Sequence, residues 1–248
     1  MKQLAIVTGA SSGIGLATVN SLLEANYTIV AGDIQPPPTA LQEQWQQQGV
    51  EFYPLDVANE GGVKQFMQSV VEKFGSIDVL VNCAGISGWG GAADVDMQQW
   101  QQILNINLTG SLLTSKYALP YMLERNSGVI VNVASIFGLE ACDNNVAYNV
   151  SKGGVIQLTR SLAADYARRG IRSNCVAPGL IETPMTAVVK EIPKMHEEFV
   201  SWHLQGRAGK PEEVAAVIEF LCSPKASFVN GQVIPVDGGF SAGRKFSI

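Results

Sequence analysis

A short apolar strand, a glycine-rich turn and an amphipathic helix follow one another at the start of the chain, and this order most constrains its fold. Residues 4–7 are rich in β-forming side chains and fit a strand buried on both faces. They lead into Thr8-Gly9-Ala10-Ser11-Ser12-Gly13-Ile14-Gly15, after which apolar residues recur at helical spacing. Glycine permits a sharp turn and lets backbone N–H groups approach a phosphate at a helix N-terminus. The order predicts a dinucleotide-binding unit, although the glycine spacing departs from the common fingerprint and an ordinary tight turn stays open.

Asp33 stands where such a unit places a carboxylate. It follows the predicted second strand, residues 28–31, and lies 18 residues after Gly15. A carboxylate there accepts hydrogen bonds from the adenosine ribose and repels the 2′-phosphate of NADP. No Arg or Lys occurs between Gly9 and Asp33 to neutralise that phosphate. NAD is therefore the favoured cofactor, and a solvated aspartate at a strand end is the alternative.

Strand-like and helix-like segments alternate along the whole chain without a linker or a change in composition. This alternation predicts one α/β domain with a doubly wound, mostly parallel, seven-stranded Rossmann-type sheet and helices on both faces. The expected strands are residues 4–7, 28–31, 51–54, 79–82, 129–133, 172–176 and 233–236. The expected helices are residues 14–25, 60–74, 100–124, 147–169 and 211–223, with a surface helix near 42–48.

Composition narrows the class of partner. The net charge of −5 argues against nucleic acid as a main partner. No apolar run of 18 residues occurs, so we expect no membrane-spanning segment. The first residues lack the apolar core of a secretion signal, which favours a cytoplasmic protein with reduced thiols. The four cysteines are scattered without Cys-x-x-Cys pairing, and no metal site is expected.

Tyr148 and Lys152 are four residues apart, so a helix brings them onto one face. A free tyrosine has a pKa near about 10, and a nearby cation favours its charged form. The pair fits a general base whose pKa lies near working pH, but such pairs also occur as ordinary surface neighbours.

These segments resemble the motifs of the short-chain dehydrogenase/reductase family, in its single-domain form of about 250 residues. The motifs, in the family's order, are Thr8 to Gly15, Asn82-Cys83-Ala84-Gly85, Asn107, Ser135, Tyr148 to Lys152, and Pro178-Gly179. The likeness covers the chain from end to end. It implies a catalytic group of Asn107, Ser135, Tyr148 and Lys152. It also implies cofactor contacts from Gly9, Ser12, Gly13, Ile14, Gly15, Asp33, Asp56, Val57, Asn82, Ala84, Gly85, Tyr148, Lys152, Pro178, Gly179, Ile181 and Thr183.

The resemblance assigns each catalytic residue a role. Tyr148 exchanges a proton with the substrate alcohol, and Lys152 lowers the tyrosine pKa and holds the nicotinamide ribose. Ser135 follows the predicted strand 129–133, where it can donate to the substrate oxygen. Asn107 is implied to hold a water that relays protons, or it is a locally satisfied polar residue that bends its helix. Cys83 replaces an asparagine that the family often carries, which we interpret as a packing variation.

The amphipathic stretch after Pro178-Gly179 corresponds to the family's substrate lid, at about residues 184–208. Its apolar face packs on the body, closes over the substrate, or does both. His196 and His203 fall in this stretch, and we expect neither metal binding nor acid/base chemistry from them. The predicted substrate-binding residues are Trp89, Ser135, Phe137, Cys142, Tyr148 and Met185.

Three functions fit the sequence. The first is an NAD-dependent oxidoreductase that interconverts a small or medium secondary alcohol or diol and its ketone. The second is a 3-oxoacyl-thioester reductase of the same fold, which usually carries a basic residue near the glycine turn. The third is a catalytically silent nucleotide-sensing or scaffold protein, against which the presence of Tyr148 and Lys152 argues. By resemblance, the helices at 100–124 and 147–169 build a homotetramer or homodimer interface.

Overall fold

The computed structural model describes residues 2–244, and its centre is one seven-stranded sheet in the order β3-β2-β1-β4-β5-β6-β7. Every neighbouring pair of strands is parallel. The strands are β1 (Leu4–Thr8), β2 (Thr28–Asp33), β3 (Glu51–Pro54), β4 (Val79–Asn82), β5 (Gly128–Val133), β6 (Ile171–Pro178) and β7 (Val233–Val236). The predicted doubly wound sheet in one domain is confirmed.

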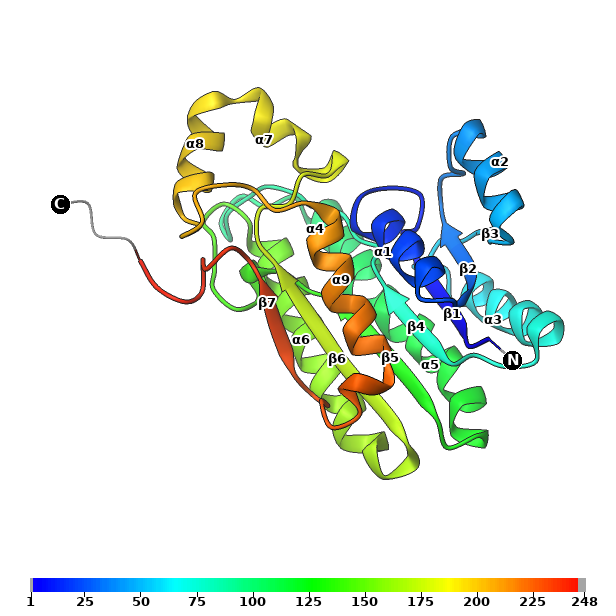
Figure 1. Cartoon of the computed structure of the whole chain (residues 1–248). Helices are drawn as coiled ribbons and strands as arrows, with labels where there is room; N and C mark the ends of the chain where they lie inside the picture. Colours follow the sequence, from blue (N-terminus) through cyan, green and yellow to red (C-terminus); the bar gives the residue numbers. More distant parts are fainter. Residues whose placement is uncertain (1, 245–248) are drawn as a thin grey trace.

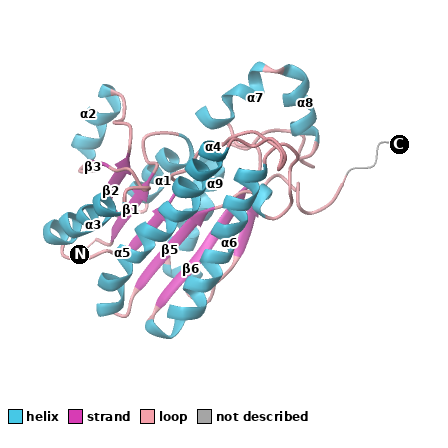
Figure 2. Cartoon of the chain, turned by 180° about the vertical axis from the view of Figure 1, so that it is seen from behind, coloured by secondary structure: helices cyan, strands magenta, loops and turns pink. Residues whose placement is uncertain are grey.

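Helices cover both faces of this sheet (Figures 1 and 2). The helices are α1 (Gly13–Glu24), α2 (Thr39–Gln48), α3 (Glu60–Phe74), α4 (Met97–Leu104), α5 (Gly110–Glu124), α6 (Val146–Tyr166), α7 (Ala187–Glu191), α8 (Pro193–Ser201) and α9 (Pro211–Cys222). Side chains of α1 and α9 share one buried cluster, while those of α3, α5 and α6 share the cluster on the opposite face.

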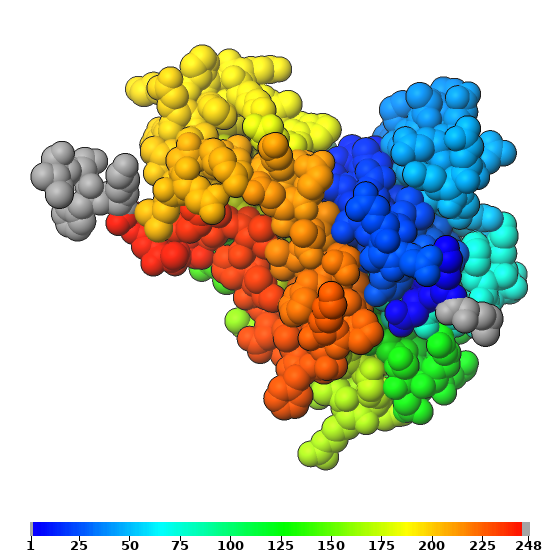
Figure 3. Space-filling view, in the orientation of Figure 1, coloured from blue at the N-terminus to red at the C-terminus, as the bar shows by residue number. Residues whose placement is uncertain are grey.

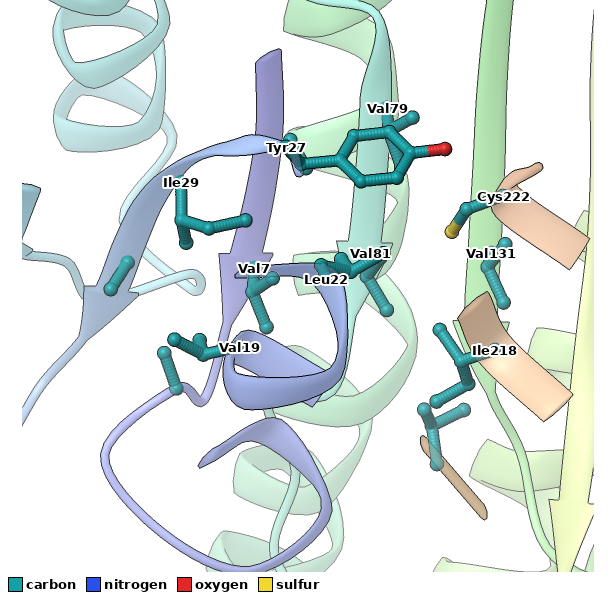
Figure 4. Close-up of a cluster of buried hydrophobic side chains, with 14 of the residues drawn as sticks. Val7, Val19, Leu22, Tyr27, Ile29, Val79, Val81, Val131, Ile218 and Cys222 are labelled. Atoms are coloured by element: carbon teal, nitrogen blue, oxygen red, sulfur yellow. The ribbon is translucent and has the colours of Figure 1, made fainter. Parts of the chain in front are cut away.

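The central strands are apolar on both sides, as a parallel sheet between two helical layers requires. Val7, Val81 and Val131 point toward α1 and α9, where Figure 4 shows Leu22 and Ile218 among them. The alternate residues of β1 and β4, Ile6 and Leu80, belong to the other cluster and are fully buried. This alternation fixes the register of the strands, because a one-residue slip would exchange the two faces.

The order of the strands reverses between β1 and β4. The chain moves outward from β1 to β2 and β3, and then returns to the other side of β1 at β4. Ligands of open α/β sheets bind at such a switch point, outside the carboxyl ends of the strands. The glycine turn that follows β1 lies at this place.

The predicted single helix 100–124 differs from the structure in its start and in its middle. The helix begins at Met97, where the Asp96 side chain caps the N-terminus by accepting from the Gln99 N–H group at 2.8 Å. A π-helical turn, Asn105–Thr109, then separates α4 from α5. Such turns insert a residue into a helix and are frequent at functional sites. Here the π-helical turn carries Asn107.

The remaining predicted boundaries differ by a few residues at most, except at two places. The predicted helix 147–169 ends as α6 at Tyr166 and continues as a short 3₁₀ turn, Ala167–Arg169. The 184–208 segment holds a 3₁₀ turn, Pro184–Thr186, followed by α7 and α8. None of the helices within residues 2–244 is both long and apolar enough to cross a membrane.

Candidate active site

A cavity lies at the carboxyl edge of the sheet, where the loops after the six strands β1 to β6 meet the start of the 184–208 segment. Figure 3 shows the surface hollowed between the yellow 184–208 segment and the blue N-terminal region. Every predicted cofactor residue except Asn82 lines this cavity. Ser135, Tyr148 and Lys152 of the predicted catalytic group line it as well.

The glycine turn forms one wall, and its glycines are required by close contacts. Gly9 and Gly13 have φ angles of 63° and 52°, in the left-handed region that favours glycine. A Cβ on Gly9 would lie 2.7 Å from the Ala84 nitrogen, and one on Gly15 would lie 1.9 Å from the Gly9 oxygen. The turn delivers the chain into the first turn of α1, whose N–H groups lack partners within the helix. This cradle fits the pyrophosphate of a dinucleotide.

Asp33 ends β2 beside this turn. Its Oδ2 accepts from the Ser11 N–H group at 2.9 Å, and its Oδ1 accepts from the Gln35 N–H group at 3.0 Å. The Ser11 hydroxyl donates to the Gln35 carbonyl oxygen at 2.8 Å. These three hydrogen bonds fix the Asp33 carboxylate between the loop after β1 and the loop after β2. Each carboxylate oxygen keeps a further lone pair for a ligand hydroxyl. Within residues 2–244, the cavity lining contains one Lys or Arg side chain, that of Lys152.

Asn82 lies beneath the cavity. Its Nδ2 donates to Asn132 Oδ1 at 2.8 Å, its Oδ1 accepts from the Thr114 hydroxyl at 2.7 Å, and Asn132 Nδ2 donates to Thr159 Oγ1 at 2.9 Å. This ladder joins β4 and β5 to the helices behind them, so the amide supports the sheet edge. The adjacent Cys83 lines the cavity, and burial raises the pKa of its thiol to about 12.

The predicted catalytic side chains come from the loop after β5 and from α6. Ser135 follows β5, and its Oγ accepts from the Phe137 N–H group at 3.1 Å. Tyr148 and Lys152 share one face of α6, with Lys152 Nζ 5.6 Å from the centre of the Tyr148 ring. The Lys152 ammonium also donates to the Val133 carbonyl oxygen at 2.8 Å. The structure therefore brings Ser135, Tyr148 and Lys152 together, as the resemblance implies.

Burial shifts the pKa values of this pair. It raises the pKa of Tyr148, although hydrogen bonding to Ser135 opposes the rise. Burial also lowers the pKa of Lys152 from 10.5 to about 8. In the protein alone, burial therefore favours the neutral forms of both groups, and a phenolate at Tyr148 requires added positive charge near the phenol.

Asn107 lies behind the cavity, and its side chain forms hydrogen bonds with the backbone of the loop after β4. Its Oδ1 accepts from the Ile86 N–H group at 2.8 Å and its Nδ2 donates to the Ile86 carbonyl oxygen at 2.9 Å. Nδ2 also donates to the Ser151 hydroxyl at 3.0 Å. A Cβ on Gly85 would lie 3.2 Å from Asn107 Oδ1 and 3.4 Å from Lys152 Nζ, so both atoms border the same small space. The implied water relay through Asn107 stays a prediction.

Three of the six predicted substrate residues line the cavity: Ser135, Tyr148 and Met185. Phe137 lies outside the lining and stacks on Phe199 of α8 with ring centres 5.6 Å apart. Trp89 is 53% exposed. Cys142 is half-buried, and its carbonyl oxygen accepts from Asn149 Nδ2 at 2.6 Å. The stacking of Phe137 on Phe199 means that Phe137 joins the body of the protein to the 184–208 segment and does not line the cavity.

His203 supports the cavity in a way that the sequence does not reveal. Its Nε2 accepts from the Leu180 N–H group at 3.0 Å, and its Nδ1 faces the Phe199 carbonyl oxygen at 2.9 Å. The proton of the neutral ring therefore sits on Nδ1. A Cβ on Gly179 would lie 2.5 Å from Nε2, so glycine is required there. Nothing in the sequence separates this buried, bonded histidine from the half-buried His196.

Comparison with known proteins agrees with this geometry. A family model described as enoyl-(acyl carrier protein) reductase matches residues 9–241. A 3-oxoacyl-[acyl-carrier-protein] reductase of Thermotoga maritima is 41% identical over 240 residues, which are 96% of this chain and 97% of the relative. This chain belongs to the short-chain dehydrogenase/reductase family.

Two further members of the short-chain dehydrogenase/reductase family extend the comparison. A meso-2,3-butanediol dehydrogenase of Serratia marcescens is 34% identical, and the match covers 97% of this chain and 95% of the relative. The solved structure of ElxO with NADP bound has a TM-score of 0.90 and 31% identity, covering 98% of this chain and 100% of that one. The relatives named in these comparisons are dehydrogenases and reductases, and this protein is an oxidoreductase of the same family.

Proposed function

We propose that the protein is an NAD-dependent dehydrogenase that interconverts a small or medium secondary alcohol or diol and its ketone. The observation that carries the choice of NAD is Asp33, whose carboxylate lines the cavity at the end of β2. A 2′-phosphate would meet this negative charge without a neighbouring cation among the lining residues, since Lys152 comes from the catalytic helix α6. The ribose hydroxyls of NAD would instead donate to it.

The catalytic side chains divide the proton chemistry. Tyr148 takes the proton of the substrate hydroxyl when an alcohol is oxidised and returns it to the substrate oxygen when a ketone is reduced. The Ser135 hydroxyl donates to that oxygen and stabilises negative charge that develops on it. When bound, the nicotinamide supplies or accepts the hydride.

The Lys152 ammonium lies 5.6 Å from the centre of the Tyr148 ring, close enough for its charge to affect the phenol. Burial raises the pKa of Tyr148 and hydrogen bonding to Ser135 lowers it. A positive charge on Lys152 favours the phenolate as well. Lowering the tyrosine pKa by three units takes about 4 kcal/mol of differential stabilisation. Positive charge on the oxidised nicotinamide acts in the same direction, so general-base strength at Tyr148 depends on a loaded site.

A second candidate is a 3-oxoacyl-thioester reductase. The 41% identity to the Thermotoga maritima reductase favours it, because that protein carries this activity in its name. The two candidates differ in cofactor preference. A reductase of this kind usually uses NADPH, for which the Gly9 to Asp33 segment offers no Arg or Lys.

Parallel titrations of the purified protein with NADH and NADPH, followed by nucleotide fluorescence, test the proposal. We expect NADH to bind at least about tenfold more tightly, since one unfavourable charge contact is worth about 1.4 kcal/mol or more. NAD-linked oxidation of a panel of secondary alcohols should follow. Preference for NADPH together with reduction of a 3-oxoacyl thioester would replace the proposal with the second candidate. Binding of neither nucleotide would favour the silent scaffold.

The assembly and the location of the protein also stay proposals. Leu112 on α5 and Val150 on α6 are 45% and 46% exposed, and these two helices are the ones that the family resemblance places in an interface. Exposed apolar side chains on such faces favour a homodimer or homotetramer. Light scattering after gel filtration distinguishes these from a monomer. Cell fractionation tests the predicted cytoplasmic location.

A further inference from the structure

An aromatic cluster outside the cavity joins three separate parts of the chain. Its rings come from the short turn after β5, from the end of α8 and from the segment after β7: Phe137, Phe199, Trp202 and Phe240. The Phe137 and Phe199 rings stack, with centres 5.6 Å apart and planes at 14°. The centre of the Phe240 ring lies 6.4 Å from that of Phe137 and 6.3 Å from that of Trp202. Aromatic pairs at these distances stabilise a contact beyond the area that they bury, so the cluster joins α8 to the body of the protein.

A tight turn holds Phe240 in this cluster. The Asp237 carboxylate accepts from the N–H groups of Gly239 and Ser241, each at 2.9 Å, and from the Ser241 hydroxyl at 2.6 Å. Gly239 has a φ angle of 90°, which favours glycine, and a Cβ there would lie 2.9 Å from Leu204 Cβ. Phe240 comes next in the chain and is only 6% exposed. The turn, which does not involve α8, therefore determines where the Phe240 ring lies.

Phe137 is fixed relative to the predicted catalytic residues. Its N–H group donates to Ser135 Oγ at 3.1 Å, a backbone bond that does not depend on the ring. The same turn packs directly on α6, since a Cβ on Gly138 would lie 2.7 Å from the Lys152 carbonyl carbon. The Phe137 ring is therefore a contact surface for α8 at a set distance from both Ser135 and Lys152.

Little else holds α7 and α8 against the body. Among residues 184–202, all of which the structure describes, only Val189 is buried. The ion pair between Lys190 and Glu182 is exposed at both ends, so it adds little. Figures 1 and 2 show both helices extending beyond the carboxyl edge of the sheet. Segments with so little burial open locally at a low free-energy cost, and the aromatic cluster is placed to raise that cost.

We propose that Phe137 and Phe240 are positioning residues that hold α8 at a set distance from Ser135 and thereby shape the substrate side of the cavity. Met185 lines the cavity, and the turn that carries it leads into α7, which packs on α8. Movement of α8 therefore displaces this wall. Both rings lie outside the cavity lining, so they act through α8 and not on the substrate. The inference rests on the proposed dehydrogenase function, because it specifies how that site holds its substrate.

Limited digestion with trypsin measures how firmly α8 is held. Lys190 in α7 and Lys194 in α8 are exposed, so trypsin cleaves at either one when the segment opens locally. In Phe240→Ala and in Phe137→Ala, cleavage at these lysines should be at least about tenfold faster than in the wild type, because each variant removes an aromatic contact with α8. Mass spectrometry of the fragments identifies the cleavage sites.

Steady-state kinetics show whether the position of α8 matters to the substrate. With saturating NAD, KM for a secondary alcohol should rise by about tenfold or more in both variants. The dissociation constant for NADH should change by less than about threefold, because the glycine turn and Asp33 follow β1 and β2, in the other half of the sheet from β5 and β7. A rise in KM without a loss of nucleotide affinity separates a positioning role from a general loss of structure.

Two further variants complete the experiment. Phe228→Ala removes a fully exposed phenylalanine before β7, so this matched control should change neither measurement. Phe240→Leu keeps an apolar side chain without a ring and replaces Phe240→Ala if the alanine variant does not fold. Unchanged cleavage or unchanged KM in the folded Phe137 and Phe240 variants would overturn the inference. Faster cleavage in these variants, with a wild type that oxidises no alcohol, would support the hold of the cluster on α8 and overturn the proposed function instead.

Discussion

Asn107 and Ile86 are joined by two hydrogen bonds, since one amide side chain accepts from the Ile86 N–H group at 2.8 Å and donates to its carbonyl oxygen at 2.9 Å. The amide thereby satisfies the N–H and carbonyl groups of Ile86, which lies in a loop after β4. The π-helical turn Asn105–Thr109 places this side chain behind Gly85, at the edge of the space that Lys152 Nζ borders.

Replacing Asn107 should therefore damage both stability and activity. Asn107→Leu leaves two backbone groups of Ile86 without partners, at a cost of about 1–3 kcal/mol for each that stays buried. We expect a lower Tm and a fall in kcat of about tenfold or more. Thermal unfolding and steady-state kinetics measure the two effects. Asn105→Leu, in the same π-helical turn, serves as the control because its side-chain bond to Gln101 is exposed. Equal effects of the two variants would contradict the role of Asn107.

Tyr148→Phe should reduce kcat by about 10²–10⁴, the range that general acid/base catalysis contributes. The ring remains, so nucleotide affinity should change little. Stopped-flow turnover and fluorescence titration with NADH separate the two quantities. Tyr166→Phe on the same helix should leave kcat unchanged. Substantial turnover by the Tyr148 variant would remove the phenol from the mechanism.

Asp33→Asn should narrow the preference for NADH over NADPH by about tenfold, because it removes one negative charge near the 2′ position. The amide oxygen still accepts from a backbone N–H group, whereas Asp33→Ala frees both Ser11 and Gln35. The alanine variant should therefore bind either nucleotide less well. An unchanged ratio of dissociation constants in the asparagine variant would mean that Asp33 does not meet the ribose.

Lys152→Met should stabilise the protein without nucleotide while abolishing turnover. Burial lowers the pKa of Lys152 to about 8, so the native state disfavours the charged form by roughly 3 kcal/mol at neutral pH. The unfolded chain binds the proton more tightly, so the stability of the wild type rises as pH increases from about 8 toward 10.5. In urea unfolding, the variant should have a higher free energy of unfolding than the wild type at pH 7, and the difference should be much smaller at pH 10. A less stable variant at pH 7 would contradict this expectation.

His203→Gln should make nucleotide binding less sensitive to acid. Burial lowers the pKa of His203, so the ring is neutral at pH 7 and accepts from the Leu180 N–H group. The nearby Asp237 carboxylate opposes this shift only in part. Below pH 6.5 the wild type loses stability as the ring gains a proton, because Nε2 becomes a donor that faces a donor. A glutamine oxygen accepts at every pH in this range. Parallel acid curves for NADH binding by both proteins would argue against this role.

The sequence predicted the sheet well because strands buried on both faces are continuous apolar runs, as residues 4–7 and 79–82 are. It also predicted the glycine turn at Gly9, the carboxylate of Asp33 after the second strand and the placement of Tyr148 and Lys152 on one helix face. Spacing between residues that are close in the sequence determines each of these features. It did not predict the π-helical turn at Asn107, which depends on the contact with Ile86 from another part of the chain. The roles of Phe137 and His203 were missed for the same reason, because their partners lie more than 20 residues away.

The two ends of the 184–208 segment meet on the body of the protein. The Gly209 N–H group donates to the Leu180 carbonyl oxygen at 2.8 Å, and the Glu182 N–H group donates to the Gly209 carbonyl oxygen at 2.9 Å. A loop closed at its base in this way can change its length and sequence without moving its attachment points. The chain between Glu182 and Gly209 can therefore be replaced without moving the rest of the fold. Grafting residues 187–208 of this stretch from a relative should transfer substrate preference and leave nucleotide affinity unchanged, because the glycine turn and Thr183 lie outside the graft.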